Sequence, residues 1–385
     1  MNGGPGRGER TPSVPANTDA SVPTLQEAVT GLARAHGSPP AAGRIRACPE
    51  DFQVTELPLV EPSGEGEHAW LLVRKRGENT ATVAERIAGI AGVRQRDVGY
   101  AGLKDRHAVT QQWFSVCLSG RGGQDWRALD TDNITLLHHT RHNRKLRRGA
   151  LLGNAFRLRV RGLSGDIDAL QSRLQQVAAD GVPNYFGEQR FGRGGSNLSA
   201  ATRLFGGTGR RLSRHQRGLV LSAARAFLFN QVLGRRVADG SWTHLLPGEA
   251  VQLAGSRSFF IADTIDGELE RRLQAGDVHP SGPLCGRGEP PVTGACRQLE
   301  DDCLAPFGDW VRGLGAAGLQ QERRALRVMP RDVAWSWPAG DELLLEFMLP
   351  AGSFATAVLR ELVQWAERRL ETEVQRAVIT VPAYF

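Results

Sequence analysis

The sequence contains no long apolar run. No segment approaches the roughly 20 consecutive apolar residues that a membrane-spanning helix needs. The first 40 residues also lack the hydrophobic core of a secretion signal. Because of these two absences, we expect neither a membrane-spanning helix nor a secretion signal, and we expect a protein without membrane association.

Cysteine is scarce, and aromatic residues make up only 6% of the chain. The cysteines are Cys48, Cys117, Cys285, Cys296 and Cys303. Their number is odd, they form no Cys-x-x-Cys pair, and their spacing matches no common zinc pattern. We therefore expect reduced thiols in a cytoplasmic protein.

The charge balance is basic. The net charge is +7 with a pI near 9.6, and arginine supplies most of the excess. Such a balance favours a polyanionic partner through counterion release, and arginine suits bidentate phosphate contacts. The alternative is a basic soluble protein without such a partner.

The length of 385 residues allows two or three domains. Residues 1–42 are rich in Pro, Gly, Ser and Thr, which predicts a disordered N-terminal segment, with order beginning near Arg44. We see no internal repeat.

Hydrophobic periodicity predicts strands alternating with helices, which indicates mixed α/β layers. Strands are expected over 69–73, 98–103, 112–118, 134–139, 154–161 and 343–349. Helices are expected over 80–90, from Ile167 to Gly181, over 222–237, and from Ser353 to about Leu370. Residues 240–303 are rich in Gly and Pro and are expected to be mostly loops.

The clearest strand pattern lies over residues 154–161. Phe156, Leu158 and Val160 alternate with three arginines. This pattern predicts a half-buried strand with a basic outer face. On the pattern alone, Phe156 is a core residue.

One acidic residue has an unusual position. Asp105 lies between Lys104 and Arg106, just after a predicted strand. Adjacent positive charge keeps a carboxylate ionised, so Asp105 is a candidate functional group. The alternative is that it only begins a turn and pairs with its neighbours.

A dense basic segment precedes the alternating strand. It holds five cations within eight residues: Arg141, Arg144, Lys145, Arg147 and Arg148. It is a candidate phosphate track or a solvated loop. The nearby His138, His139 and His142 have no Cys or carboxylate beside them, so we expect no metal site there.

A second basic segment, residues 184–197, is rich in glycine. Its glycines would let the backbone approach phosphates, or would simply form a turn between domains. It is not a P-loop, because no Gly-Lys-Ser/Thr follows.

Several segments together resemble the TruD family of tRNA pseudouridine synthases, and they occur in that family's order. They are residues 48–52 (CPEDF), 102–108 (GLKDRHA), 153–156 (GNAF), 182–187 (VPNYFG), 222–231 and 350–356 (PAGSFAT). The resemblance covers about residues 43–362.

The resemblance implies an α+β fold. Its pseudouridine synthase catalytic domain, over 43–179 and 329–385, has a mixed, largely antiparallel sheet with flanking helices. An α/β TRUD domain is inserted over 180–328, and RNA would lie in the cleft between them. The implied activity is isomerisation of uridine 13 in the D arm of tRNA. No metal, no organic cofactor and no obligatory protein partner are implied.

The resemblance also assigns roles by position. Asp105 matches the catalytic aspartate. Phe52, Asn154 and Phe354 match residues that contact the target nucleotide, and Phe156 matches an aromatic that stacks on uracil. Arg46 stands where relatives can carry a Lys paired with the aspartate; it can hold the carboxylate but cannot release a proton.

The chemistry fits these residues. The uridine would flip into the pocket, stack on phenylalanines, and undergo covalent attack by Asp105 at C6 or at C1′. The Asn154 amide offers a donor and an acceptor. Two other hypotheses stay open: a non-catalytic RNA-binding protein, and a hydrolase with Asp105 as general base, for which no second acid lies close in sequence.

Overall fold

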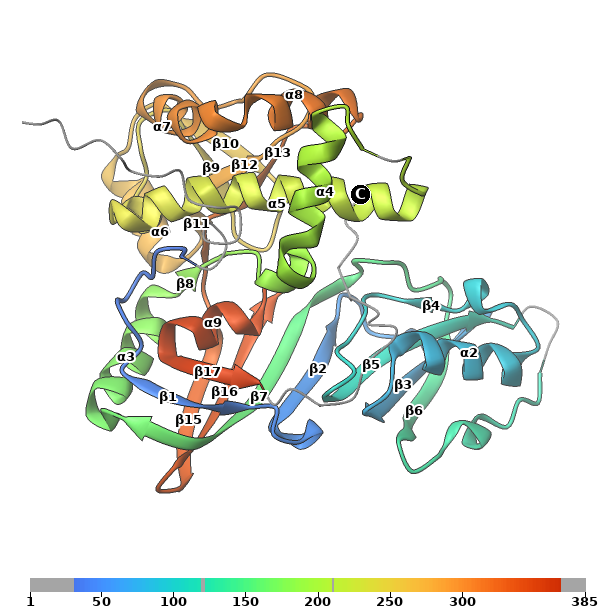
Figure 1. The fold of residues 1–385 in the computed structure, drawn as a ribbon. Coiled ribbons are helices and arrows are strands. Elements are labelled where there is room, and N and C mark those ends of the chain that lie inside the picture. Colours follow the sequence, from blue (N-terminus) through green and yellow to red (C-terminus); the bar gives the residue numbers. More distant parts are fainter. Residues whose placement is uncertain (1–30, 119–121, 210, 368–385) are drawn as a thin grey trace, which may run out of the picture.

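The computed structural model describes residues 31–118, 122–209 and 211–367 (Figure 1). Within these ranges no helix is long and apolar enough to cross a membrane. Figure 1 shows a large sheet with helices on it, and a second body containing α4 to α8 above that sheet.

The large sheet has 10 strands, in the order β15-β16-β7-β2-β5-β3-β6, with β1, β4 and β17 attached at its side. Among the strand pairs of this sheet that the structure describes, only β1·β17 and β2·β5 are parallel. The mixed, largely antiparallel sheet is therefore confirmed. The strands are β1 (Ala41–Ile45), β2 (Phe52–Pro58), β3 (His68–Arg76), β4 (Gly99–Tyr100), β5 (Val109–Cys117), β6 (Ile134–His142), β7 (Leu151–Gly165), β15 (Arg331–Ala339), β16 (Glu342–Pro350) and β17 (Val363–Glu367).

Strand β7 is the longest strand and pairs with β16, β2 and β1. Its expected alternation is present, because Phe156, Leu158 and Val160 are all buried in one core. The intervening arginines pair with acids instead of forming a free basic face. Arg161, for example, contacts both Asp51 and Glu342.

Helices α2 (Thr80–Ala91), α3 (Ile167–Asp180) and α9 (Ala355–Leu362) cover the sheet. Helix α3 begins where the Asp166 side chain accepts a hydrogen bond from Ala169 N, and it ends at Gly181. The expected helix from Ser353 to about Leu370 is wrong. Helix α9 ends at Leu362, because the next residues pair with β1 as strand β17; residues 368–370 lie outside the described ranges.

The second body holds the segment between β7–α3 and β15. Its elements are β8 (Val182–Pro183), α4 (Ser196–Phe205), α5 (Arg214–Ala238), β9 (Glu249–Leu253), β10 (Phe259–Ala262), α6 (Gly267–Ala275), β11 (Val278–His279), β12 (Ser281–Leu284), α7 (Gly294–Leu304), α8 (Gly308–Ala316), β13 (Glu322–Ala325) and β14 (Arg327–Val328). Short 3-10 helices lie at Pro49–Asp51, Gln95–Asp97, Trp126–Leu129, Glu188–Phe191, Arg193–Gly195, Ser241–Thr243 and Ala305–Phe307.

Two expectations about this body are wrong. Residues 240–303 are not mostly loops, because their short strands and helices pack around small cores. Helix α5 begins at Arg214 rather than at 222, because Ser213 and Gln216 form a capping box.

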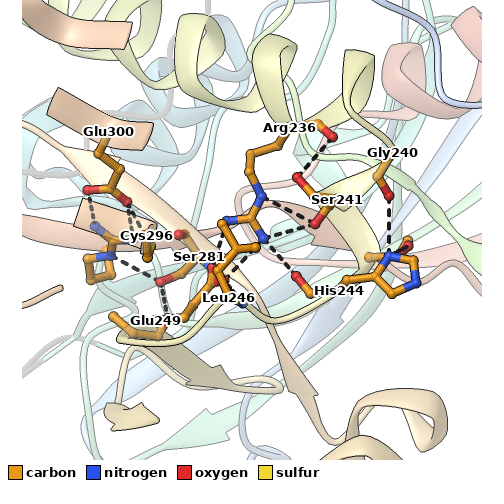
Figure 2. Close-up of polar contacts among 12 residues, drawn as sticks. Arg236, Gly240, Ser241, His244, Leu246, Glu249, Ser281, Cys296 and Glu300 are labelled. Atoms are coloured by element: carbon orange, nitrogen blue, oxygen red, sulfur yellow. Dashed lines mark hydrogen bonds and ion pairs between the residues drawn. The ribbon is translucent and has the colours of Figure 1, made fainter. Parts of the chain in front are cut away.

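Buried charges hold this body together. Arg236 from α5 and Glu249 from β9 form an ion pair with side chains about 1% exposed or less (Figure 2). Arg323 pairs with Glu300 in the same way, and both pairs contact Ser281. These bonds join helices α5 and α7 to strands β9, β12 and β13, so the polar cluster specifies how they pack.

The chain enters the second body through β8 and leaves it through β14, and these two strands pair. We propose that the domain boundary follows this pair, with 43–179 and 329–385 in one domain and 180–328 in the other; residues 368–385 lie outside the described ranges. The expected disorder of residues 1–42 is wrong for 31–42: Leu32 packs against the core around Tyr185, and Ala41 begins β1. Residues 1–30 lie outside the described ranges.

Candidate active site

A pocket opens between the large sheet and the second body. It is lined by Arg46, Phe52, Val54, residues 101–105, Arg148, Gly149, Leu151, Asn154, Phe156, Gln189 and residues 352–356. All six residues that the sequence pointed to for catalysis and nucleotide contact are among them. Gln189 comes from the second body, so both parts of the chain build the pocket.

Asp105 lies in the loop between β4 and β5. The preceding strand is shorter than expected, ending at Tyr100. The Asp105 carboxylate is 36% exposed, and its Oδ2 lies 3.1 Å from Nη2 of Arg46, which is 12% exposed. The acid is therefore accessible from the pocket while a partly buried cation holds it.

Arg46 has a strained backbone. Its φ is 55, a left-handed conformation that costs most side chains energy. Its guanidinium carbon lies 4.1 Å from the centre of the Phe52 ring. The arginine is thus held between the Phe52 ring and the Asp105 carboxylate.

Lys75 lies beneath the Asp105 loop and was not singled out from the sequence. Its Nζ donates to the carbonyl oxygens of Asp105 and Glu78, at 2.8 and 2.7 Å. Burial lowers the Lys75 pKa to about 8, although the Asp105 charge opposes this shift. The side chain fixes the backbone that carries the acid.

Three phenylalanines form apolar walls. Phe156 is both a core residue and a pocket residue: it is 8% exposed, stacks on Phe347 at 5.4 Å, and meets Phe52 edge-on at 6.3 Å. Phe354 is partly exposed, and its ring lies 6.3 Å from Phe186 of the second body. The partly exposed Phe354 ring and the packed rings of Phe52 and Phe156 together suit a flat apolar ligand.

Asn154 is on β7, and its side chain reaches Lys104. The Lys104 Nζ donates to Oδ1 of Asn154 at 2.7 Å and lies 2.9 Å from Oε2 of Glu56. Both Lys104 and Glu56 are buried, at 6% and 3% exposed. Glu56 is an acid close to the pocket that sequence proximity to Asp105 did not reveal.

The basic segment reaches the pocket at one end only. Arg148 lines the pocket, with its guanidinium 3.9 Å from the Tyr100 ring centre. Lys145 donates to the Arg96 carbonyl oxygen, and the remaining candidates, Arg141, Arg144 and Arg147, do not line it. Arg144, Lys145 and Arg147 are exposed, whereas Arg141 is half-buried.

The histidines beside this segment pack structurally. His142 is buried and lies edge-on to Trp70 at 4.6 Å, and His138 meets Trp113. Among the residues that the structure describes, no three His, Cys, Asp or Glu side chains gather as a metal site.

Sequence reasoning missed Lys75, Lys104, Glu56 and Gln189. Lys104 had a signal, because it adjoins Asp105. Lys75 and Glu56 had none, since Lys75 is one of three consecutive cations at the end of β3 and Glu56 is a single acid in β2. Gln189 lies in the glycine-rich segment 184–197, where the glycines and aromatic residues form the pattern and a single amide adds no signal of its own.

Comparison with known proteins identifies the family of this chain. The family model described as tRNA pseudouridine synthase D (TruD) matches residues 32–199 and 196–362. A tRNA pseudouridine synthase D of Methylococcus capsulatus is 52% identical over 334 residues, covering 87% of this chain and 94% of that protein. One of Nitrosococcus oceani is 53% identical over 334 residues, covering 86% and 93%.

The fold has a solved counterpart. The crystal structure of a protein described as tRNA pseudouridine synthase D from Methanosarcina mazei superposes with a TM-score of 0.68 at 20% identity, over 89% of this chain and 98% of that chain. The family model and the curated relatives show that the chain is a pseudouridine synthase, an isomerase. The chain belongs to the tRNA pseudouridine synthase D (TruD) family.

Proposed function

We propose that this protein converts uridine 13 in the D arm of tRNA to pseudouridine, with Asp105 as the nucleophile. The observation that carries the proposal is the Asp105 carboxylate, held 3.1 Å from Arg46 at a pocket walled by phenylalanines. Membership of a family of tRNA pseudouridine synthases supports the substrate class.

The reaction moves one bond. The bond between N1 of uracil and C1′ of ribose breaks, a bond between C5 and C1′ forms, C5 loses its proton and N1 gains one. No atom is added or lost overall. A covalent bond to Asp105 would hold one of the two parts, the uracil or the ribose, in the site while the bond between them is broken. Attack at C6 of uracil or at C1′ of ribose would both serve.

The pocket suits a flipped base. A uridine inside an RNA fold must leave its stack before an enzyme can reach C5 or C1′. The rings of Phe354 and Phe156 line the pocket and would offer stacking surfaces, each worth about 1–3 kcal/mol per base. Stacking would offset the cost of unstacking the nucleotide.

Arg46 has a charge role only. Its guanidinium donates a hydrogen bond to the Asp105 carboxylate and has no acceptor, so it orients the acid but does not remove the C5 proton. The arginine would also neutralise the acid while the anionic RNA approaches.

The tRNA backbone would follow the basic segment to the pocket mouth. Arg148 lines the pocket, and Arg141, Arg144, Lys145 and Arg147 precede it on the same segment. Gln189 of the second body lines the pocket too, which supports RNA lying in the cleft between the domains.

The test is to map pseudouridine in unmodified tRNA after incubation with the wild type or with Asp105→Asn. We expect pseudouridine at position 13 with the wild type alone, and tRNA binding by both proteins. Asn keeps the shape of Asp but removes its charge and nucleophilicity.

Two results would count against the proposal. Binding of tRNA by both proteins without pseudouridine would favour a non-catalytic RNA-binding protein. Full activity of Asp105→Asn would leave the reaction in place but remove Asp105 from the nucleophilic role.

A further inference from the structure

A buried ion pair lies behind Asn154. Lys104 and Glu56 are 6% and 3% exposed, and their charged atoms are 2.9 Å apart. The Glu56 Oε1 also accepts a hydrogen bond from the Trp113 backbone N at 3.2 Å. Glu56 therefore holds the ammonium group of Lys104 at a fixed place next to β7.

This ammonium group determines which way the Asn154 amide points. An ammonium group has three donors and no acceptor, so only the oxygen of an amide can face it favourably. The observed contact is Nζ to Oδ1, at 2.7 Å. Exchanging the amide's oxygen and nitrogen would place an N–H group against the ammonium.

The other end of the amide is left for a ligand. Asn154 lines the pocket, and within the described residues its Nδ2 donates to no protein acceptor. The acceptor atom of the Asn154 amide, Oδ1, is therefore used by Lys104, whereas its donor atom, Nδ2, remains available to a ligand. The pocket thus presents an N–H group of fixed polarity beside its aromatic walls.

We propose that Glu56 and Lys104 are positioning residues that make Asn154 a hydrogen-bond donor to a carbonyl oxygen of the target uracil. The inference rests on the proposed function, because it concerns the base held in the same pocket. Uracil carries carbonyl acceptors at C2 and C4. Cytosine carries an amino donor at C4, so an N–H donor facing that position would reject cytosine.

The experiment combines substrate analogues with variants of the full-length protein. A tRNA transcript is made with uridine, 2-thiouridine or 4-thiouridine at the target position, since sulfur is a poorer hydrogen-bond acceptor than oxygen. Rates of pseudouridine formation are compared for the wild type, Asn154→Asp, and the double variant Glu56→Gln/Lys104→Met. The double variant removes both buried charges together, so no unpaired charge is left to unfold the protein.

For the wild type, we expect one of the two thio substitutions to lower kcat/KM by about five- to tenfold, the effect of one lost neutral hydrogen bond. Asn154→Asp keeps the contact with Lys104 but has no N–H group, so it should lose at least as much with uridine. We call the ratio of kcat/KM for uridine to that for the thiouridine the thio effect. In the double variant the amide can rotate, and the thio effect should shrink to within about twofold.

A matched control is Glu300→Gln/Arg323→Met, which removes another buried ion pair in the second body. It should keep the full thio effect. The inference is overturned if neither thio substitution affects the wild type, if Asn154→Asp matches the wild type, or if the double variant keeps the full thio effect. In each case pseudouridine made by the wild type from uridine leaves the proposed function standing, and its absence overturns both.

Discussion

Arg46 and Asp105 stand 59 residues apart in the chain and meet at 3.1 Å in the pocket. Arg46 follows β1, whereas Asp105 follows β4, and neither strand pairs with the other. The pair forms because the order of strands in the sheet brings these two loops to one side. The ion pair between Arg46 and Asp105 therefore depends on the tertiary fold and not on sequence proximity.

Replacing Arg46 tests this contact. Arg46→Lys keeps a cation, so we expect kcat/KM to stay within about tenfold of the wild type. Arg46→Met removes the partner that orients Asp105 and should lower kcat/KM by on the order of 100-fold, a usual result of misplacing a reacting group. Pseudouridine formation under single-turnover conditions measures both.

The matched control is Arg157→Met, which breaks the exposed pair with Glu346 on the same sheet. It should leave kcat/KM nearly unchanged. Wild-type activity in Arg46→Met would show that Asp105 needs no cation.

Lys75 gives a prediction about pH. Its pKa falls from 10.5 in the unfolded chain to about 8 in the folded protein. Between these values the unfolded chain binds more protons, so stability rises with pH, and the full cost of burying the charge is present below about pH 8. Relative to Lys75→Met, the wild type should gain about 2 kcal/mol in unfolding free energy from pH 7.5 to pH 10.

Urea unfolding at the two pH values measures this difference. Lys145→Met removes an exposed lysine and should show the wild-type pH dependence. Equal pH dependence in the wild type and Lys75→Met would mean that Lys75 is not buried as a charged group.

Gly153 precedes Asn154 and lies against β16. A Cβ at Gly153 would be 2.1 Å from the Leu349 carbonyl oxygen, so strand β7 would have to shift. Gly153→Ala should therefore cost about 1–3 kcal/mol of stability and lower activity by displacing Asn154. Thermal unfolding and pseudouridine formation report the two effects.

Gly89, on helix α2, provides the comparison, because a Cβ there would meet no atom within 4 Å apart from the backbone of its own helix. Gly89→Ala should stabilise the protein by up to about 1 kcal/mol and leave activity unchanged. If Gly153→Ala behaved like Gly89→Ala, β7 would have more freedom at Gly153 than this close approach allows.

The buried pair Arg323–Glu300 should contribute strongly to stability when one partner is lost. Both side chains are at most 4% exposed. Arg323→Met leaves an unpaired buried carboxylate and should cost about 3–5 kcal/mol, whereas adding Glu300→Gln should recover most of that loss.

Denaturant unfolding measures these changes. Arg312→Met breaks an ion pair with side chains 75% and 77% exposed and should have little effect. An effect of Arg323→Met as small as that of Arg312→Met would contradict the expected burial.

Local rules determined much of this protein from the sequence. Helix α3 matches its prediction because a capping Asp and a terminal Gly both act within a few residues. Strand β7 was recognisable because its alternating residues reflect one buried face. The motifs were sufficient to indicate the family and, through the resemblance, six of the residues that line the pocket, from Arg46 to Phe354.

Only the tertiary structure decided the remaining features. Residues 363–367 read as a continuing helix, but the open edge of β1 supplies hydrogen bonds that make them a strand. The contacts of Lys104 with Glu56 and Asn154, and of Lys75 with Asp105, join residues 30 to 50 positions apart. A local pattern cannot show such contacts, because burial and pairing depend on which strands become neighbours.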